Sequence, residues 1–312
     1  MNIVYMGTPD FAVAPLQALI DAGHSIKAVY TQPDRPKGRG HKLVAPPVKE
    51  LALQYDIPVY QPVSLKNPEE IERFQNIDAD ICVVAAYGKI LPKSFLDTPK
   101  FGCINIHGSL LPLYRGAAPI QWSVINGDKA TGITIMHMSV GLDEGDIILQ
   151  ESVDILENDT SEDMYGKLST VGAGLILKVL ELISRGDASR ISQDQVGIEP
   201  TYAPMLSKDL SRMDFSKSAQ ILHNLVRGLY PWPVAKTIVN GKNLKVFKTS
   251  VLSEQYDDFV VGQIVSDDRF IVKCGDDTAI ELLEVQVDGK KRTTGADFMR
   301  GYRLKSGDEI GE

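Results

Sequence analysis

An asparagine and a histidine two residues apart are the first candidates for chemistry. Asn105 and His107 stand in an apolar stretch that ends at Gly108. Side chains alternate along a strand, so these two would share one face, about 6.6 Å apart. The imidazole can act as acid, base or hydrogen-bond donor to a developing oxyanion, whereas the amide can only hydrogen-bond. The pair could bracket one small reacting group; the alternative is a core histidine bonded to its neighbour.

A carboxylate to orient the imidazole or relay its proton is offered by Asp143. Gly141 and Gly145 flank it and indicate a tight loop. A simple turn aspartate and a divalent-metal loop are the alternatives, and metal is disfavoured because oxygen ligands do not recur at calcium-loop spacing. The sequence has no Gly-x-Ser-x-Gly elbow, and no cysteine stands beside a histidine. We therefore expect direct transfer between two bound substrates without a covalent intermediate.

Alternating strand and helix signals predict the element that positions these residues. A Rossmann-like, mostly parallel sheet with helices on both faces is expected, and the carboxyl ends of such strands bind ligands. The expected strands cover residues 2–6, 25–31, 80–86, 102–106, 132–138 and 147–155. Residues 8–10 are expected to cap a helix, Asn67 to cap the next, and residues 159–184 to form a long helix. A single glycine, Gly7, in the first turn argues against NAD binding, and a P-loop is missing.

The last third of the chain has a different pattern. We expect a catalytic domain over residues 1–188, a linker over 189–206 and a second domain over 207–312. After a helix at 216–227, short strands are expected at 234–239, 244–251, 260–265, 269–274 and 279–287. Their spacing predicts a small β-barrel of the oligonucleotide-binding (OB) type.

Composition indicates an ordinary globular protein. The 312 residues include three widely spaced cysteines, which indicates a reducing compartment rather than a disulfide framework or zinc site. No basic leader or long apolar run is present, so a soluble, cytoplasmic protein is expected.

The net charge of −8 disfavours a nucleic-acid partner, but the charge is unevenly distributed. Residues 1–206 hold 17 Lys/Arg against 25 Asp/Glu, while residues 207–312 hold 16 of each, out of 33 and 41 in total. Within the acidic part, residues 32–49 carry five basic side chains and one acid. Long loops of this kind in compact domains are functional or disordered, so residues 32–46 are either a solvated loop or a binding element.

Several motifs together resemble the folate-dependent formyltransferase superfamily, and within it the methionyl-tRNA formyltransferases. The superfamily motifs are Asn105-x-His107-Gly108-Ser109-Leu110-Leu111-Pro112, Arg115-Gly116-Ala117-Ala118-Pro119 and Gly141-Leu142-Asp143-x-Gly145-Asp146, with residues 7–12 and 86–92. The motifs of the narrower group lie at residues 31–40, at Gln121-Trp122-Ser123 and at Pro231-Trp232-Pro233. The resemblance covers nearly the whole chain.

The resemblance implies formyl transfer from 10-formyltetrahydrofolate to the α-amino group of methionyl-initiator tRNA. It implies that Asn105, His107 and Asp143 are catalytic, without a metal. The turn Ser109-Leu110-Leu111-Pro112 is then a folate contact, and residues 87–92 help to enclose the pterin.

Further implied contacts involve the tRNA, and the enzyme is expected to be a monomer. Arg39, with Lys37 and Lys42, would enter the acceptor stem, since arginine reads base edges and phosphates bidentately. The second domain would hold the rest of the tRNA, and its candidate phosphate contacts are Lys242, Lys245, Lys248, Lys290, Lys291 and Arg292. Three alternatives stay open. They are formyl transfer to a small amine, hydrolysis that releases formate from the same formylated folate, and a catalytically silent binding module.

Overall fold

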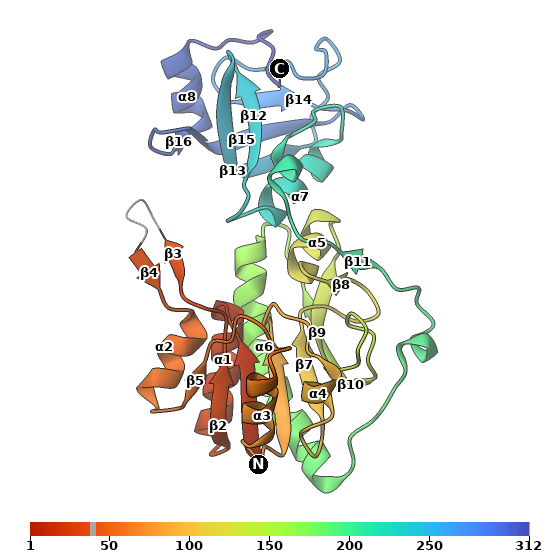
Figure 1. Ribbon diagram of the computed structural model, residues 1–312. Helices are drawn as coiled ribbons and strands as arrows, with labels where there is room; N and C mark the ends of the chain where they lie inside the picture. Colours follow the sequence, from red (N-terminus) through yellow and green to blue (C-terminus); the bar gives the residue numbers. More distant parts are fainter. Residues whose placement is uncertain (38–41, 312) are drawn as a thin grey trace. The chain divides into compact units, whose positions relative to one another are not determined.

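The chain forms two compact units. A computed structural model describes residues 1–37 and 42–311 (Figure 1). The first unit comprises Met1–Pro119, Ala130–Asp154 and Tyr165–Ala203. The second comprises Ile120–Lys129, Ile155–Met164 and Pro204–Glu312. Each unit is therefore built from three separate stretches of sequence.

A seven-stranded, mostly parallel sheet forms the centre of the first unit, as expected. Its strands are β1 (Asn2–Gly7), β2 (Ser25–Tyr30), β5 (Val59–Tyr60), β6 (Ile81–Ala85), β7 (Cys103–His107), β9 (Ala130–His137) and β10 (Ile147–Asp154). The order is β10-β9-β7-β6-β1-β2-β5. In this sheet β9 runs opposite to the other strands, and it pairs Asn105 with Met136 and His107 with Thr134.

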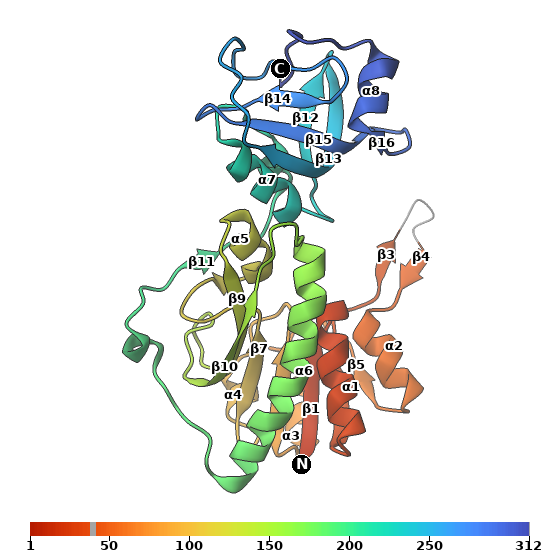
Figure 2. The ribbon, with the colours of Figure 1, turned by 180° about the vertical axis from the view of Figure 1, so that it is seen from behind.

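Helices cover both faces of this sheet (Figures 1 and 2). They are α1 (Val13–Asp21), α2 (Pro47–Gln54), α3 (Pro68–Gln75), α4 (Lys93–Leu96) and α6 (Ser161–Arg185), whose first turn belongs to the second unit. Figure 2 shows α1 and α6 in front of the sheet, with α3 and α4 behind it. A Cβ on Gly172 of α6 would lie 3.0 Å from Ile106, whereas Cys103 packs with Phe74 and Phe95 of α3 and α4. The even-numbered side chains of β7 therefore face α6, and Asn105 and His107 face the other side.

The two expected helix caps have different outcomes. Asn67 caps α3 as predicted, because its Oδ1 accepts a hydrogen bond from the Glu69 amide at 3.2 Å. The expected cap at residues 8–10 is wrong: a 3-10 turn (Asp10–Ala12) precedes α1, and neither has a side-chain cap. Thr8 instead donates its hydroxyl to the carbonyl of Tyr87 at 3.1 Å. The hydroxyl thus connects two loops at the carboxyl ends of β1 and β6.

An antiparallel sheet forms the centre of the second unit, in keeping with the expected small barrel. Its strands are β12 (Ala235–Val239), β13 (Lys242–Leu252), β14 (Ile271–Lys273), β15 (Ala279–Val287) and β16 (Thr293–Thr294). The order is β12-β13-β15-β14, with β16 on β15. The helical segments are α5 (Pro119–Ile125, whose first residue lies in the first unit), a 3-10 turn (Lys208–Ser211), α7 (Ala219–Gly228) and α8 (Gly295–Tyr302). Leu222, Val246, Phe270, Ile280 and Phe298 are among its buried core residues.

Two features of the second unit differ from expectation. The strand expected at 260–265 is wrong: this stretch makes only isolated bridges, from Gln263 to Glu309 and from Ile264 to Val272. The helix α8 was not expected, although Thr294 caps it by accepting from the Asp297 amide at 3.1 Å. Its Thr-x-x-Asp spacing is a recognisable start signal.

The stretch expected to be a linker lies along the first unit as far as Ala203. Ile191 bridges Ile147 of β10. Farther on, β11 (Tyr202–Ala203) pairs in parallel with β8 (Arg115–Gly116). Among the described residues, no helix is both long and apolar enough to span a membrane.

Candidate active site

The three candidate catalytic side chains meet in the first unit. Asn105 Nδ2 lies 3.5 Å from Asp143 Oδ1, and His107 Nδ1 lies 3.7 Å from Asp143 Oδ2. Asn105 and His107 come from one face of β7, and Asp143 comes from the loop between β9 and β10. The His107 side chain is 5% exposed and that of Asp143 14%. A carboxylate, an imidazole and an amide thus lie together in a site with little exposure to solvent.

The two nitrogens of His107 have different partners. Nε2 lies 3.0 Å from the carbonyl oxygen of Tyr114. A carbonyl can only accept, so Nε2 carries a proton. Nδ1 faces Asp143 at a distance slightly beyond hydrogen-bond range. Nδ1 is therefore the ring nitrogen available to a reacting group.

The Asp143 loop is held in a tight conformation. Asp143 has a φ of 52°, a left-handed conformation that costs a non-glycine residue about 1–2 kcal/mol. Its Oδ2 accepts from the Gly116 amide at 2.9 Å. A Cβ on Gly145 would lie 1.7 Å from the carbonyl oxygen of His137, so this position requires glycine. The expected tight loop is confirmed.

A residue that sequence analysis missed supports the same loop. Gln193 is 2% exposed and donates Nε2–H to the carbonyls of Asp143 at 2.8 Å and Gly145 at 2.9 Å. Its Oε1 accepts from Nε and Nη2 of Arg115 at 2.9 and 2.7 Å. The sequence gives no signal for this glutamine, because it lies in a stretch without periodicity. Only the folded path of the chain brings it to its partners, which are distant in sequence.

The turn expected to contact folate is anchored to β9. Ser109 donates its hydroxyl to the carbonyl of Leu113 at 2.6 Å, and the hydroxyl of Thr134 donates to the Ser109 carbonyl at 2.6 Å. The side chains of Ser109 and Leu111 are buried, Pro112 is buried and Leu110 is half-buried. The turn is therefore rigidly held, and its contact with folate stays a prediction.

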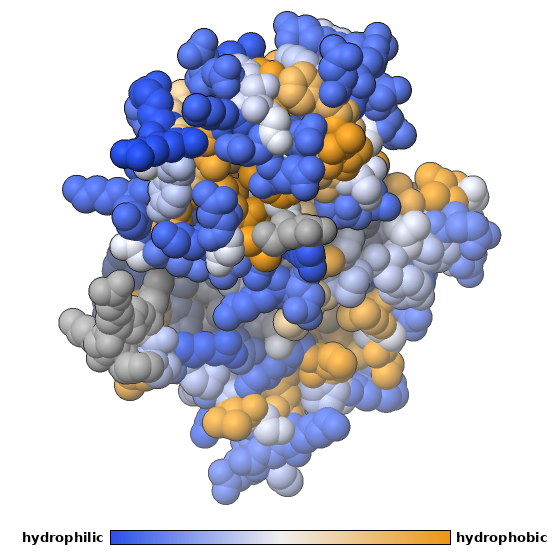
Figure 3. Space-filling view, turned by 90° about the horizontal axis from the view of Figure 1, so that it is seen from above, coloured by the Kyte–Doolittle hydropathy of each residue, from blue (hydrophilic) through white to orange (hydrophobic). Residues whose placement is uncertain are grey.

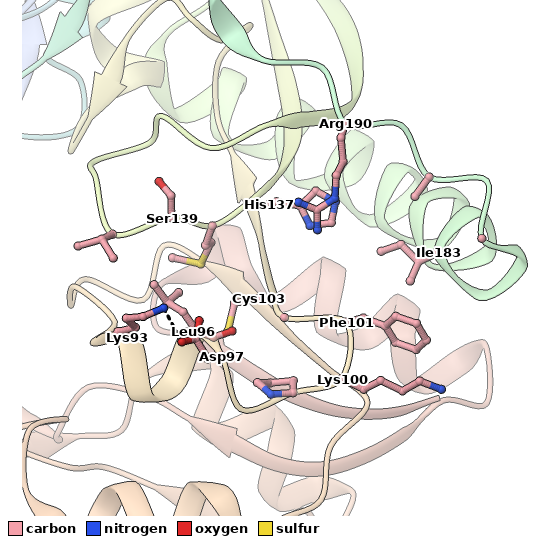
Figure 4. Close-up of a pocket in the computed structure, with 16 residues that line it drawn as sticks. Lys93, Leu96, Asp97, Lys100, Phe101, Cys103, His137, Ser139, Ile183 and Arg190 are labelled. Atoms are coloured by element: carbon pink, nitrogen blue, oxygen red, sulfur yellow. Dashed lines mark hydrogen bonds and ion pairs between the residues drawn. The ribbon is translucent and has the colours of Figure 1, made fainter.

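A cavity of about 710 Å³ lies at the amino end of β7. Figure 4 shows its walls: α4, the start of β7, the end of β9 and the stretch after α6. Cys103, which lines it, is on the same face of β7 as Asn105, and Ser139 and Val140 in its wall lead to the Asp143 loop. Burial lowers the pKa of His137 in this wall, and the nearby Arg190 lowers it further. A neutral imidazole therefore lines the cavity at neutral pH.

Two of the predicted tRNA contacts of the first unit end the strands of a hairpin. Arg39 lies outside the described residues; Lys37 and Lys42 pair through their backbones, at the ends of β3 (Arg35–Lys37) and β4 (Lys42–Val44). At the base of the hairpin, Lys49 Nζ lies 2.9 Å from Asp34, and Gln61 Nε2 donates to Asp34 at 2.7 Å. These hydrogen bonds, first from Gln61 and then from Lys49, lower the pKa of Asp34.

Several basic candidates of the second unit already have partners. Lys245 lies 3.0 Å from Asp288. The Arg292 guanidinium lies 3.6 Å from the centre of the Phe247 ring, and Lys242 Nζ lies 5.5 Å from that of Tyr302. The face in Figure 3 is mostly hydrophilic, with apolar residues scattered over it.

Known proteins are similar to this chain over its whole length. The family model for formyl transferase matches residues 1–180, and the model for the formyl transferase C-terminal domain matches residues 205–303. A protein named methionyl-tRNA formyltransferase from Alkaliphilus oremlandii is 46% identical over 314 residues and covers 100% of both chains. The protein of that name from Clostridioides difficile is 46% identical over 312 residues, again covering 100% of both.

Solved structures share the fold. WlaRD, a sugar 3N-formyl transferase, has a TM-score of 0.66 at 21% identity, covering 93% of this chain and 99% of that one. HypX from Aquifex aeolicus, solved with tetrahydrofolic acid, has a TM-score of 0.65 at 15% identity, covering 97% of this chain and 47% of that one. With both of its parts matched and full-length relatives at 46% identity, the chain belongs to the formyl transferase family.

Proposed function

We propose that this enzyme transfers the formyl group of 10-formyltetrahydrofolate to the α-amino group of methionyl-initiator tRNA. The observation that carries the proposal is the meeting of Asn105, His107 and Asp143. The substrate assignment is supported by full-length relatives named methionyl-tRNA formyltransferase.

The chemistry follows from the atoms that face the site. The neutral amine attacks the formyl carbon, so a carbon–nitrogen bond forms as the bond to the folate nitrogen breaks. Asn105 Nδ2 and, when protonated, His107 Nδ1 donate to the formyl oxygen as it gains negative charge. Asp143 stabilises the imidazolium and helps move a proton from the attacking amine to the departing folate nitrogen.

The folate has a candidate place beside these residues. The cavity at the amino end of β7 is lined by no member of the trio, of the turn at 109–112 or of residues 87–92. We therefore assign the folate ring system to the turn at Ser109, Leu110, Leu111 and Pro112 and to residues 87–92, which follow the carboxyl ends of β7 and β6.

The tRNA would be held by basic residues away from the trio. Lys37 and Lys42 end the two strands of the hairpin, whose base is fixed by the contact of Lys49 with Asp34, and Arg39 lies between them in sequence. The second unit would contact the rest of the tRNA. A monomeric enzyme in the cytoplasm and a reaction without metal complete the proposal.

Transfer of radiolabelled formyl from 10-formyltetrahydrofolate tests it. Methionyl-initiator tRNA is the acceptor, and free methionine and an elongator methionyl-tRNA are the controls. Labelling of the initiator species alone is the expected result. Formyl loss to water or to a small amine would retain the trio but overturn the tRNA assignment, and no turnover of folate would overturn the reaction itself.

A further inference from the structure

We infer that Gln193 is a positioning residue for this reaction, which holds the backbone of the Asp143 loop so that the carboxylate meets Asn105 and His107. The inference rests on the proposed function. Gln193 lies in the short 3-10 turn Gln193–Val196, in the stretch that joins the two parts matched by the family models. It is nevertheless buried against the catalytic loop.

The amide of Gln193 makes all the hydrogen bonds that it can form. Its two Nε2 protons go to the carbonyls of Asp143 and Gly145, and Oε1 accepts two bonds from Arg115. Since Arg115 can only donate and the carbonyls can only accept, the orientation of the amide is fixed. A buried side chain with every polar atom paired has one low-energy position.

The neighbouring strand β8 therefore holds Asp143 in two ways. The amide of Gly116 binds the carboxylate directly at 2.9 Å. The side chain of Arg115, the preceding residue, is buried and holds the loop backbone through Gln193. One contact fixes the side chain and the other fixes the main chain from which it projects.

Such support matters because the loop has an unfavourable conformation. Asp143 has a positive φ, and backbone of this kind persists only where its surroundings enforce it. The His107 Nδ1 to Asp143 Oδ2 distance of 3.7 Å leaves little room for further separation. A displacement of about 1 Å at a reacting centre can cost about 100-fold in rate.

Gln193→Glu is the sharpest variant. It keeps the size and the contact with Arg115, but an ionised carboxylate cannot donate to the carbonyls of Asp143 and Gly145. We expect kcat to fall by about 10- to 100-fold, while KM for folate and for tRNA changes by less than about threefold. Gln195→Glu is the matched control, because Gln195 is exposed in the same turn, and it should behave as wild type. If Gln193→Glu does not fold, Gln193→Met is tested in its place. Methionine has a similar length but no N–H group to donate, so we expect the same loss of kcat.

A double-mutant comparison separates positioning from general stability. In an Asp143→Asn background, Gln193→Glu should lower the residual kcat by less than about twofold, because the carboxylate that it positions is gone. Multiplicative losses, or Gln193→Glu with wild-type kcat, would overturn the inference. An Asp143→Asn enzyme with full activity would instead overturn the proposed catalytic role of Asp143. A nearly inactive Asp143→Asn beside a fully active Gln193→Glu would overturn the positioning role alone.

Discussion

Within the site, the contacts of His107 and Asn105 determine which nitrogen atom of each can reach the substrate. His107 is bound through Nε2 to a backbone carbonyl, so only Nδ1 can approach substrate. Asn105 Nδ2 is 3.5 Å from Asp143, a long contact that leaves the amide able to turn toward a stronger acceptor. A formyl oxygen that gains charge is such an acceptor. The resting contacts of the trio are thus weaker than those expected during reaction.

Removal of the Asn105 amide is the direct test of this role. We expect Asn105→Ala to lower kcat by about 10²–10³, with the melting temperature nearly unchanged, since the side chain is partly exposed. Single-turnover formyl transfer measures the effect. Asn76→Ala, at the exposed end of α3, is the control. Turnover within a few-fold of wild type in Asn105→Ala would remove Asn105 from the mechanism.

Among the elements, the β9–β10 loop depends strongly on its sequence. Two glycines flank Asp143, but their surroundings differ. A Cβ on Gly145 would come nearest to the backbone carbonyl of His137, whereas a Cβ on Gly141 would come nearest to the side-chain carboxylate of Glu144. Glu144 is exposed, so its side chain can move aside. The loop is therefore rigid after Asp143 and adaptable before it.

Gly145→Ala and Gly141→Ala form a matched pair. Gly145→Ala must displace the loop, and we expect kcat to fall by at least about 10-fold. Gly141→Ala should remain within about threefold of wild type. Steady-state kinetics and thermal melting of both variants measure the difference. Equal activity in the two would show that the backbone contact at His137 does not fix Asp143.

Sequence periodicity predicted the elements far better than the contacts between them. The two-residue period of β7 correctly placed Asn105 and His107 on one face, because alternation is a property of any strand. The strand expected at 260–265 is wrong, and Val260 and Val261 within that range are both exposed. Gln193 could not be predicted, since its partners lie 50 and 78 residues away in sequence.

At the scale of the whole molecule, the second unit is held together by contacts between distant stretches of chain. Ser161 donates its hydroxyl to the carbonyl of Gly228 at 2.7 Å. His223 Nε2 lies 3.2 Å from the carbonyl of Glu157, and its Nδ1 lies 2.9 Å from the Thr249 hydroxyl. His223 is buried, and burial lowers its pKa below the usual value. A neutral imidazole thus connects three parts of this unit.

This arrangement predicts a pH dependence of stability. The pKa of His223 is lower in the folded than in the unfolded protein, so the unfolded state binds more protons as the pH falls. Stability should therefore decrease below about pH 6.5, the ordinary histidine value. We expect His223→Gln to have a lower melting temperature at pH 8 but a smaller loss between pH 8 and pH 5. Parallel melting curves for variant and wild type would contradict the role of His223.

The second unit is made of three separate stretches of sequence, and this limits how the unit could be exchanged between genes. Beyond Pro204–Glu312, it includes the stretches Ile120–Lys129 and Ile155–Met164, which lie between strands of the first unit in sequence. A recombination event that copied only the end of the gene would leave both stretches behind. The unit would arrive without Ser161, the partner of Gly228, and without Glu157, one of the two partners of His223. Exchange of this part between genes is therefore constrained to relatives that already encode these two stretches.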